Sequence, residues 1–195
     1  MGLDSVELLM LVEKHFSISI PDAEAEKAYT IGKLVDCVAK ILNVTAYDFS
    51  LRENTFASIK KEILDLKSYQ LPFKITDKVS NSLDVEDKDL IIDLENRIGL
   101  KFPGIDTSAT NTNSLLLKLK HWFNTTASIS FEQITWKKYV DIMLAENLYN
   151  LSKPLAYTSK YEIYIAIMRI TVDKIGIDYE EIGIGKSFTD DLGVD

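Results

Sequence analysis

The chain resembles itself at a fixed spacing, and this internal repeat restricts its fold more than any other feature of the sequence. Apolar positions in the first copy recur 82 residues later without a gap. Leu8, Leu9, Met10, Val12, Phe16, Ile18, Ile20 and Pro21 fall on Leu90, Ile91, Ile92, Leu94, Ile98, Leu100, Phe102 and Pro103. At a shift of 81, Leu34, Val35, Val38, Ile41 and Leu42 then meet Leu115, Leu116, Leu119, Trp122 and Phe123. We therefore expect two copies of one helical unit.

A second match relates the end of the chain to its middle at a constant shift of 109. Ile165, Met168, Val172, Ile175, Ile182, Phe188 and Leu192 fall on Phe56, Ile59, Ile63, Leu66, Phe73, Val79 and Leu83. The chain thus ends with the helix and loop that come first in the middle copy. The repeat predicts a split domain made of residues 1–43 plus 160–195, and a continuous domain over residues 52–124.

The periodicity of each copy indicates helices. Asp4 followed by Glu7 is a capping-box-like start for a helix from Ser5 to Phe16. Pro21 opens a short acidic helical turn, and Thr30 can cap a third helix. The predicted fold class is all-α: two small four-helix bundles joined by a helical connector.

The connector is assigned to residues 125–159, because residues 128–159 match neither repeat. Ile134, Val140, Met143, Leu144 and Leu148 have the spacing of one amphipathic helix, with Trp136 and Tyr139 near its start.

Composition excludes several classes of partner. The chain has 195 residues, with 22 Lys and Arg against 30 Asp and Glu, a net charge of −8. Binding to nucleic acid or anionic lipid mainly by charge requires a basic excess. Charges interrupt every apolar run well before the roughly 20 residues that cross a bilayer. The single cysteine, Cys37, and the lack of a basic leader followed by an apolar run suggest a cytoplasmic protein.

Two long motifs resemble the acyl carrier protein family. The run from Ser187 to Asp195, continued by Ser5-Val6-Glu7-Leu8, looks like the family's modification site, in which Gly-x-Asp-Ser opens the second helix. The run from Ile20 to Lys27, followed by Thr30, is also close to the family pattern. The resemblance covers residues 1–43 and 160–195 well, and residues 52–124 more weakly, as a degenerate copy.

The resemblance implies a carrier of acyl groups. In the family, a phosphopantetheinyl transferase attaches the 4'-phosphopantetheine arm of coenzyme A to a serine hydroxyl, and the arm's thiol holds the acyl group as a thioester. Ser5 is the matching residue, with Asp4 before it. The first turn of a helix suits a phosphate, because it offers unpaired N–H groups and a positive dipole end. The implied setting is fatty acid or polyketide-type biosynthesis.

The family also docks on basic patches of acyl-transferring or synthase enzymes through acidic side chains. We expect this role for Glu7, and for Glu13 on the same helix, while the acidic residues of the turn after it are solvated.

The middle copy has Asp87 at the position of Ser5. A carboxylate has no hydroxyl to accept the arm, so we expect this copy to stay unloaded, with Asp87 favouring the start of its helix. The alternative for the whole chain is a non-carrying helical interaction or scaffold module built from degenerate carrier domains.

No enzyme active site or metal site is apparent in the sequence. Gly185-Lys186-Ser187 ends like a phosphate-binding loop but has Glu180 where that motif needs glycine. His15 and His121 lack ligand neighbours at metal-binding spacing. Cys37 lies among apolar residues and is interpreted as a core thiol. We therefore expect a protein that is not an enzyme.

Closure of the split domain has three alternatives. Residues 160–195 can fold back on residues 1–43 of the same chain, or they can complete a neighbour's bundle and give a domain-swapped assembly. The chain can also be a piece of a longer tandem protein, with a serine of its own after Asp195. We favour closure within one chain.

Overall fold

A computed structural model of the chain describes residues 3–66, 72–104, 129–151 and 156–194. Within these ranges the regular structure consists of α-helices and short 3-10 turns, and the β-pairings are two isolated bridges. The predicted all-α class is confirmed. None of the helices in the described ranges is long and apolar enough to cross a membrane.

The chain divides into two compact units. The first unit joins residues 1–51 to residues 144–195, and the second unit comprises residues 52–143. The beginning and the end of the chain therefore build one unit together. The finer limits drawn from the repeat, and the identity of each unit as a carrier-like bundle, stay predictions.

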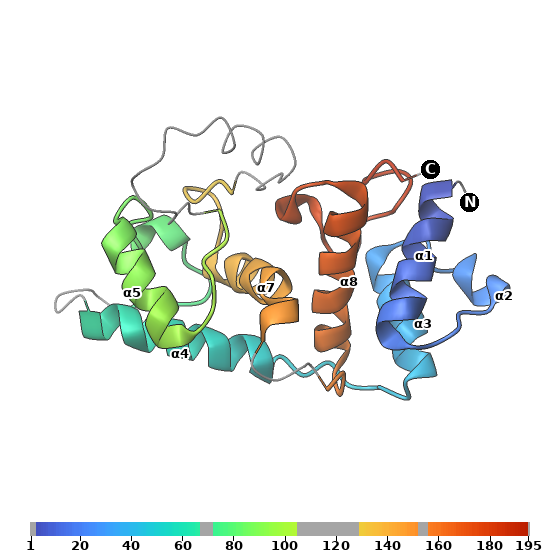
Figure 1. Cartoon of the computed structure of the whole chain (residues 1–195), viewed down its shortest axis with the longest axis horizontal. Coiled ribbons are helices and arrows are strands. Elements are labelled where there is room, and N and C mark those ends of the chain that lie inside the picture. Colours follow the sequence, from blue (N-terminus) through green and yellow to red (C-terminus); the bar gives the residue numbers. More distant parts are fainter. Residues whose placement is uncertain (1–2, 67–71, 105–128, 152–155, 195) are drawn as a thin grey trace. The chain divides into compact units, whose positions relative to one another are not determined.

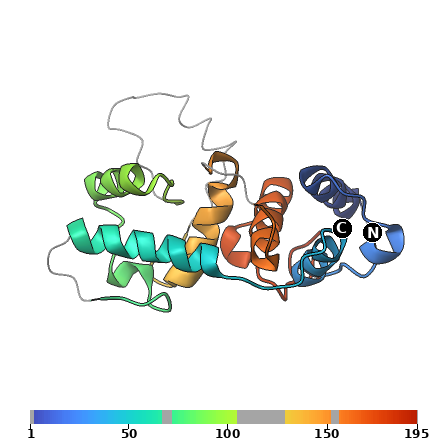
Figure 2. The same ribbon diagram turned by 90° about the horizontal axis from the view of Figure 1, so that it is seen from below.

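The first unit is organised around the long helix α8, Lys160–Ile175. This helix packs on α1 (Leu3–Phe16) and on α3 (Ile31–Ile41), with the short α2 (Asp22–Ala25) beside α3 (Figures 1 and 2). The one-turn 3-10 helices η2 (Leu148–Asn150) and η3 (Tyr179–Glu181) complete it. Its core consists of the buried apolar stripes of these helices, including Leu8, Val12, Leu34, Val35, Val38, Ile165, Ala166 and Met168.

Capping interactions set the limits of these helices. The Ser159 hydroxyl and the Glu162 carboxylate form a capping box at the start of α8, and Gly176 ends it in the left-handed region at φ +75°. Thr30 accepts a hydrogen bond from the Lys33 N–H at the start of α3, as expected. These signals are local, and the sequence analysis identified one of them, the Thr30 cap.

The second unit contains α4 (Ser50–Leu66), the 3-10 turn η1 (Val79–Asn81), α5 (Lys88–Ile98) and most of α7 (Trp136–Glu146). Its core combines aliphatic residues of α4 and α5 with aromatic residues around α7. Trp136 is fully buried, stacks on Phe73 with ring centroids 5.4 Å apart, and donates a hydrogen bond to Ser82 Oγ at 2.8 Å. The predicted connector helix is thus an integral part of the packed structure.

Backbone hydrogen bonds show that α7 has the place in the second unit that α3 has in the first. In the first unit, the N–H groups of Ile31 and Gly32 donate to the carbonyls of Lys186 and Ile184. In the second, the N–H groups of Trp136 and Lys137 donate to the carbonyls of Asp77 and Ile75. The isolated bridges, Thr30 to Ser187 and Lys78 to Thr135, obey the same shifts of 105 and 109 residues.

This correspondence corrects the expected layout of the middle copy. The stretch matched to α3 from the sequence, residues 115–123, lies outside the described residues, and α7 is the helix that pairs with the loop before α5. The expectation that residues 128–159 match neither repeat is wrong, because Thr30, Lys33, Val35 and Asp36 correspond to Thr135, Lys138, Val140 and Asp141.

A side-chain hydrogen bond also recurs at the 82-residue shift. The Ile20 N–H donates to Glu13 Oε1 at 2.6 Å, and the Phe102 N–H donates to Glu95 Oε1 at 2.9 Å. In both units a glutamate in the last turns of the helix holds the chain segment that leaves it. The repeat therefore extends to a polar contact, beyond the apolar pattern that first revealed it.

Candidate functional site at the start of α1

Ser5 lies in the first turn of α1 and is half-buried. Because α1 begins at Leu3, Asp4 and Ser5 are both helical residues, and the expected capping-box start at Asp4 is wrong. The first turn of a helix leaves backbone N–H groups without partners inside the helix, and its dipole favours negative charge there. Ser5 thus lies at the end of α1 that favours an anion.

An apolar cavity of about 90 Å³ lies next to this turn. Ser5 is one of its lining residues, and the others come from α1, α2, the loop between α2 and α3, α3 and the loop after Ser187. The lining is Ser5, Leu8, Leu9, Ala25, Glu26, Ala28, Tyr29, Leu34, Phe188 and Thr189. A group attached to the Ser5 hydroxyl therefore has an apolar space beside it within the first unit.

The loop over residues 187–194 borders the cavity through Phe188 and is tied by its own hydrogen bonds. The Ser187 N–H donates to Asp191 Oδ2 at 2.8 Å, and the Val194 N–H donates to the Phe188 carbonyl at 2.8 Å. The backbone hydrogen bond from Ser187, together with Lys186 nearby, lowers the pKa of Asp191. Figures 1 and 2 show the end of this loop beside the start of α1. Phe188 and Thr189 of this loop thus line the same cavity as Ser5.

Two acidic residues of α1 contact a lysine of α8. Lys174 Nζ pairs with the Glu7 carboxylate and lies 3.5 Å from Asp4 Oδ1. Its hydrogen bond to Glu7 raises the pKa of Lys174. These pairs attach the first turn of α1 to α8. Glu7 keeps 46% of its side chain exposed, so docking of a partner stays an expectation for it.

Glu13 has a structural role that the sequence did not indicate, because its carboxylate accepts the Ile20 N–H. A docking role for Glu13 also stays an expectation.

The remaining candidates from the sequence do not form a reactive group. Cys37 is buried, and burial raises the pKa of its thiol. His15 shares a hydrogen bond of 2.6 Å with the Tyr157 hydroxyl, and burial lowers its pKa. His121 lies outside the described residues. Among the residues that the structure does describe, no group of three or more His, Cys, Asp or Glu is placed to hold a metal ion.

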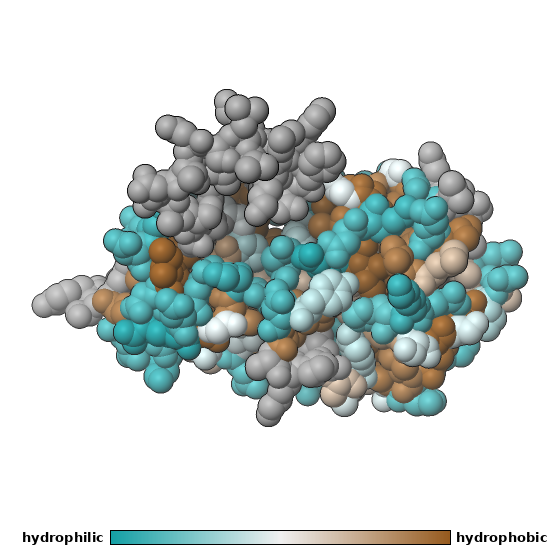
Figure 3. Space-filling view, viewed as in Figure 1, coloured by the Kyte–Doolittle hydropathy of each residue, from teal (hydrophilic) through white to brown (hydrophobic). Residues whose placement is uncertain are grey.

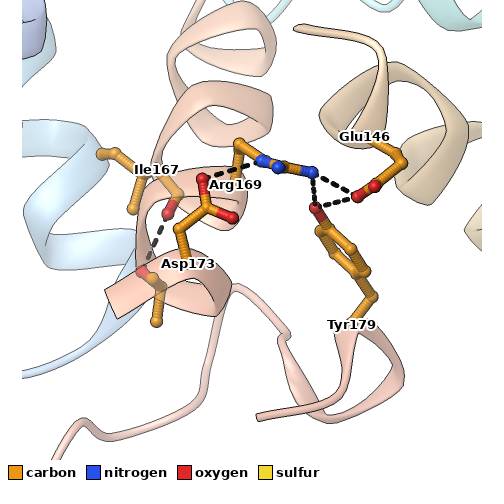
Figure 4. Close-up of polar contacts among 6 residues, drawn as sticks. Glu146, Ile167, Arg169, Asp173 and Tyr179 are labelled. Carbon is orange, nitrogen blue, oxygen red and sulfur yellow. Dashed lines mark hydrogen bonds and ion pairs between the residues drawn. The ribbon is translucent and has the colours of Figure 1, made fainter. Parts of the chain in front are cut away.

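The sequence analysis did not predict a polar cluster that forms around Arg169 of α8 (Figure 4). The Arg169 guanidinium pairs with Glu146, lies 2.8 Å from Asp173 Oδ2 and donates to the Tyr179 hydroxyl at 2.8 Å. The Tyr179 hydroxyl donates in turn to Glu146 at 2.7 Å, and burial raises the pKa of Tyr179. The cluster joins α7, α8 and η3. Only the Arg169–Asp173 pair is local enough to be read from helical spacing.

In the second unit, Asp87 caps α5. Its Oδ1 accepts the Leu90 N–H at 3.1 Å, as a capping residue does. This contact agrees with the interpretation that Asp87 serves the start of its helix.

One part of the chain is similar to acyl carrier proteins. Over 41 residues it is 48% identical to the acyl carrier proteins of two strains of Porphyromonas gingivalis. The match covers 21% of this chain and 53% of each relative, so the chain spans about half the length of the curated relatives it matches. No family model matches the chain. No solved structure matches it. The chain thus contains a region like an acyl carrier protein.

Proposed function

We propose that this protein is an acyl carrier that holds acyl intermediates as thioesters on a 4'-phosphopantetheine arm attached to Ser5. The observation that carries the proposal is the position of Ser5, in the first turn of a helix and in the lining of an apolar cavity. The 48% identity to acyl carrier proteins over 41 residues supports the same function.

In the first unit, the arm would be held by a covalent bond to Ser5 and by the positive end of the α1 dipole. A phosphopantetheinyl transferase forms a bond between Ser5 Oγ and the phosphorus of the pantetheine phosphate, and the adenosine bisphosphate part of coenzyme A leaves. The attached phosphodiester then lies at the N-terminal end of α1, where the helix dipole favours an anion. The arm itself supplies the thiol that carries the acyl group.

The cavity is suited to the first part of an acyl chain. An apolar cavity of about 150 Å³ is known to hold a molecule of the size of benzene. The cavity beside Ser5 is smaller, about 90 Å³, and its lining is mostly apolar. A short apolar group at the end of the arm therefore has a candidate binding space here.

The exposed side of α1 offers a surface to partner enzymes. Val6 and Met10 are exposed at 41% and 60%, close to the acidic Asp4 and Glu7. Figure 3 shows apolar residues at the surface over α1, among hydrophilic ones. Acidic residues steer encounter with basic enzymes, and apolar ones give contact area. We assign this face to transferases and to acyl-transferring or synthase enzymes of fatty acid or polyketide-type biosynthesis.

The test is an intact-mass measurement after incubation with coenzyme A and a broad-specificity phosphopantetheinyl transferase. We expect a gain of one arm per chain in the natural protein and no gain in Ser5→Ala. Ser80→Ala, which removes another exposed hydroxyl, is the matched control and should gain one arm. An unmodified natural protein would instead support the non-carrying interaction module, and a gain that persists in Ser5→Ala would place the arm elsewhere.

A further inference from the structure

The charge of the chain is distributed unequally between its units. The first unit contains 9 Lys and Arg against 17 Asp and Glu, whereas the second contains 13 of each. The whole net charge of −8 therefore belongs to the unit with Ser5, and the second unit is neutral. A neutral unit can still present a local excess of one sign, and the second unit does so at one place.

Three exposed lysines gather where the loop before η1 pairs with the start of α7. Lys74, Lys78 and Lys137 are all exposed, and we call them the lysine surface. The bridge from Lys78 to Thr135 and the hydrogen bond from the Lys137 N–H to the Ile75 carbonyl bring these two segments side by side.

Several charged groups adjoin the lysine surface. Lys138 follows on α7, and Lys60 Nζ lies 5.7 Å from the ring centre of Phe73, next to Lys74. The acidic side chains on the same segments are Asp77 and Glu132, and Asp77 Oδ2 accepts the Lys74 N–H. On the loop before η1 and at the start of α7, the exposed lysines Lys74, Lys78 and Lys137 thus outnumber the two carboxylates.

The backbone pairing that recurs in both units does not require lysines at these positions. At the corresponding positions the first unit has Gly183, Ser187 and Gly32, although the backbone pairing is the same. The basic character is thus a property of the second unit alone.

A large aromatic residue of the second unit corresponds to a leucine that lines the cavity of the first unit. Leu34 lines the cavity beside Ser5, and its counterpart at the shift of 105 is Tyr139. Tyr139 is fully buried and donates a hydrogen bond to the Pro103 carbonyl at 3.0 Å. Asp87 stands at the position of Ser5, so the corresponding residue of this unit has no hydroxyl for the arm.

We propose that the lysine surface of the second unit docks the acidic first unit of a second copy of this chain. Charge complementarity selects this occupant, because the first unit carries the entire acidic excess and exposes Asp22 and Glu26 on and next to α2. A head-to-tail contact of this kind pairs unlike surfaces and keeps the two acidic units apart. The proposal does not depend on loading of Ser5.

The experiment measures self-association of the full unloaded chain by sedimentation equilibrium at two ionic strengths. Charges act over about 30 Å at 0.01 M salt and about 3 Å at 1 M. At low salt we expect the average mass to rise above 22.1 kDa as the protein concentration increases. At high salt we expect the average mass to remain at 22.1 kDa. In Lys74→Gln/Lys137→Gln the dissociation constant should increase about tenfold, because each exposed charge pair contributes up to about 1 kcal/mol.

The matched control is Lys61→Gln/Lys88→Gln, which removes the same charge from exposed positions elsewhere in the second unit. Its dissociation constant should change less than threefold. Equal effects of both pairs, association that persists at 1 M salt, or a mass of 22.1 kDa under all conditions would overturn the proposal. Each of these results is independent of whether Ser5 accepts an arm.

Discussion

At the scale of single residues, Glu13 and Ser5 show how one helix combines a structural contact with a candidate site. Glu13 Oε1 accepts the Ile20 N–H at 2.6 Å, and Ile20 is a buried residue of the first core. A hydrogen bond to a charged group contributes about 1.5–3 kcal/mol. Ser5, two turns earlier on the same helix, is left at the surface of the cavity.

We predict that Glu13→Ala lowers the free energy of unfolding by about 1.5–3 kcal/mol, because the Ile20 N–H loses its acceptor. Glu13→Gln keeps an acceptor and should cost less. Urea unfolding of the full chain checks both, with Glu26→Ala as a control at an exposed position. A Glu13→Ala variant as stable as the Glu26→Ala control would contradict this role.

His15 gives a prediction for pH. Burial lowers its pKa from the ordinary 6.5, and the ring packs against Phe16 and Tyr157. The unfolded chain therefore binds a proton at His15 at a higher pH than the folded chain does. Stability then falls as the pH drops below about 6.5.

An NMR titration of the His15 ring should give a midpoint below 6.5. The ring signal is assigned by its absence in His15→Gln, and that variant should also lose the part of the pH dependence that begins near 6.5. A midpoint at or above 6.5 would show that the ring is not buried as described.

At the scale of the elements, α7 is the helix that closes the second unit. Trp136 is its first residue, fully buried and hydrogen-bonded to Ser82. Trp136→Ala removes this packing and should lower the free energy of unfolding by about 3–5 kcal/mol. Lys137→Ala, one residue further on the exposed side, should change it by less than about 0.5 kcal/mol. Thermal unfolding followed by circular dichroism distinguishes the two, and equal losses would refute this role for α7.

Much of the helical layout could be predicted from residues close together in the sequence. Thr30, Pro21 and the apolar stripe around Leu34 are local signals, and the helices they predict are present. The closing helix of the middle copy was misassigned because the leucines near residue 115 have the same 3.6-residue period as α3. Periodicity alone does not distinguish two amphipathic segments. The hydrogen bonds of α7 to Ile75 and Asp77 do, and they join residues about 60 positions apart.

The candidate site was predictable only in part for the same reason. The motif around Ser5 is divided between the two ends of the chain, but each half is ordered enough to be recognised in the sequence. The cavity depends on residues brought together from both ends of the chain, and the Arg169 cluster joins Glu146 of one helix to Tyr179 of a later turn. No local pattern specifies which of these residues meet.

At the scale of the whole molecule, closure of the first unit within one chain predicts a monomer when charge interactions are screened. In 1 M salt, light scattering should give a mass near 22.1 kDa over a wide range of concentration. Domain swapping exchanges buried helices and is not weakened by salt in this way. A stable mass of twice this value or more in 1 M salt would therefore favour the swapped form.

The central claim is that one carrier site, at Ser5, serves the whole chain. The most direct test is localisation of the arm by mass spectrometry of peptides from the full chain, after incubation with transferase and coenzyme A. We predict that the peptide containing Ser5 carries one arm and that the peptide containing Asp87 carries none. An arm found on any other peptide, or a Ser5 peptide that stays unmodified, would contradict the claim.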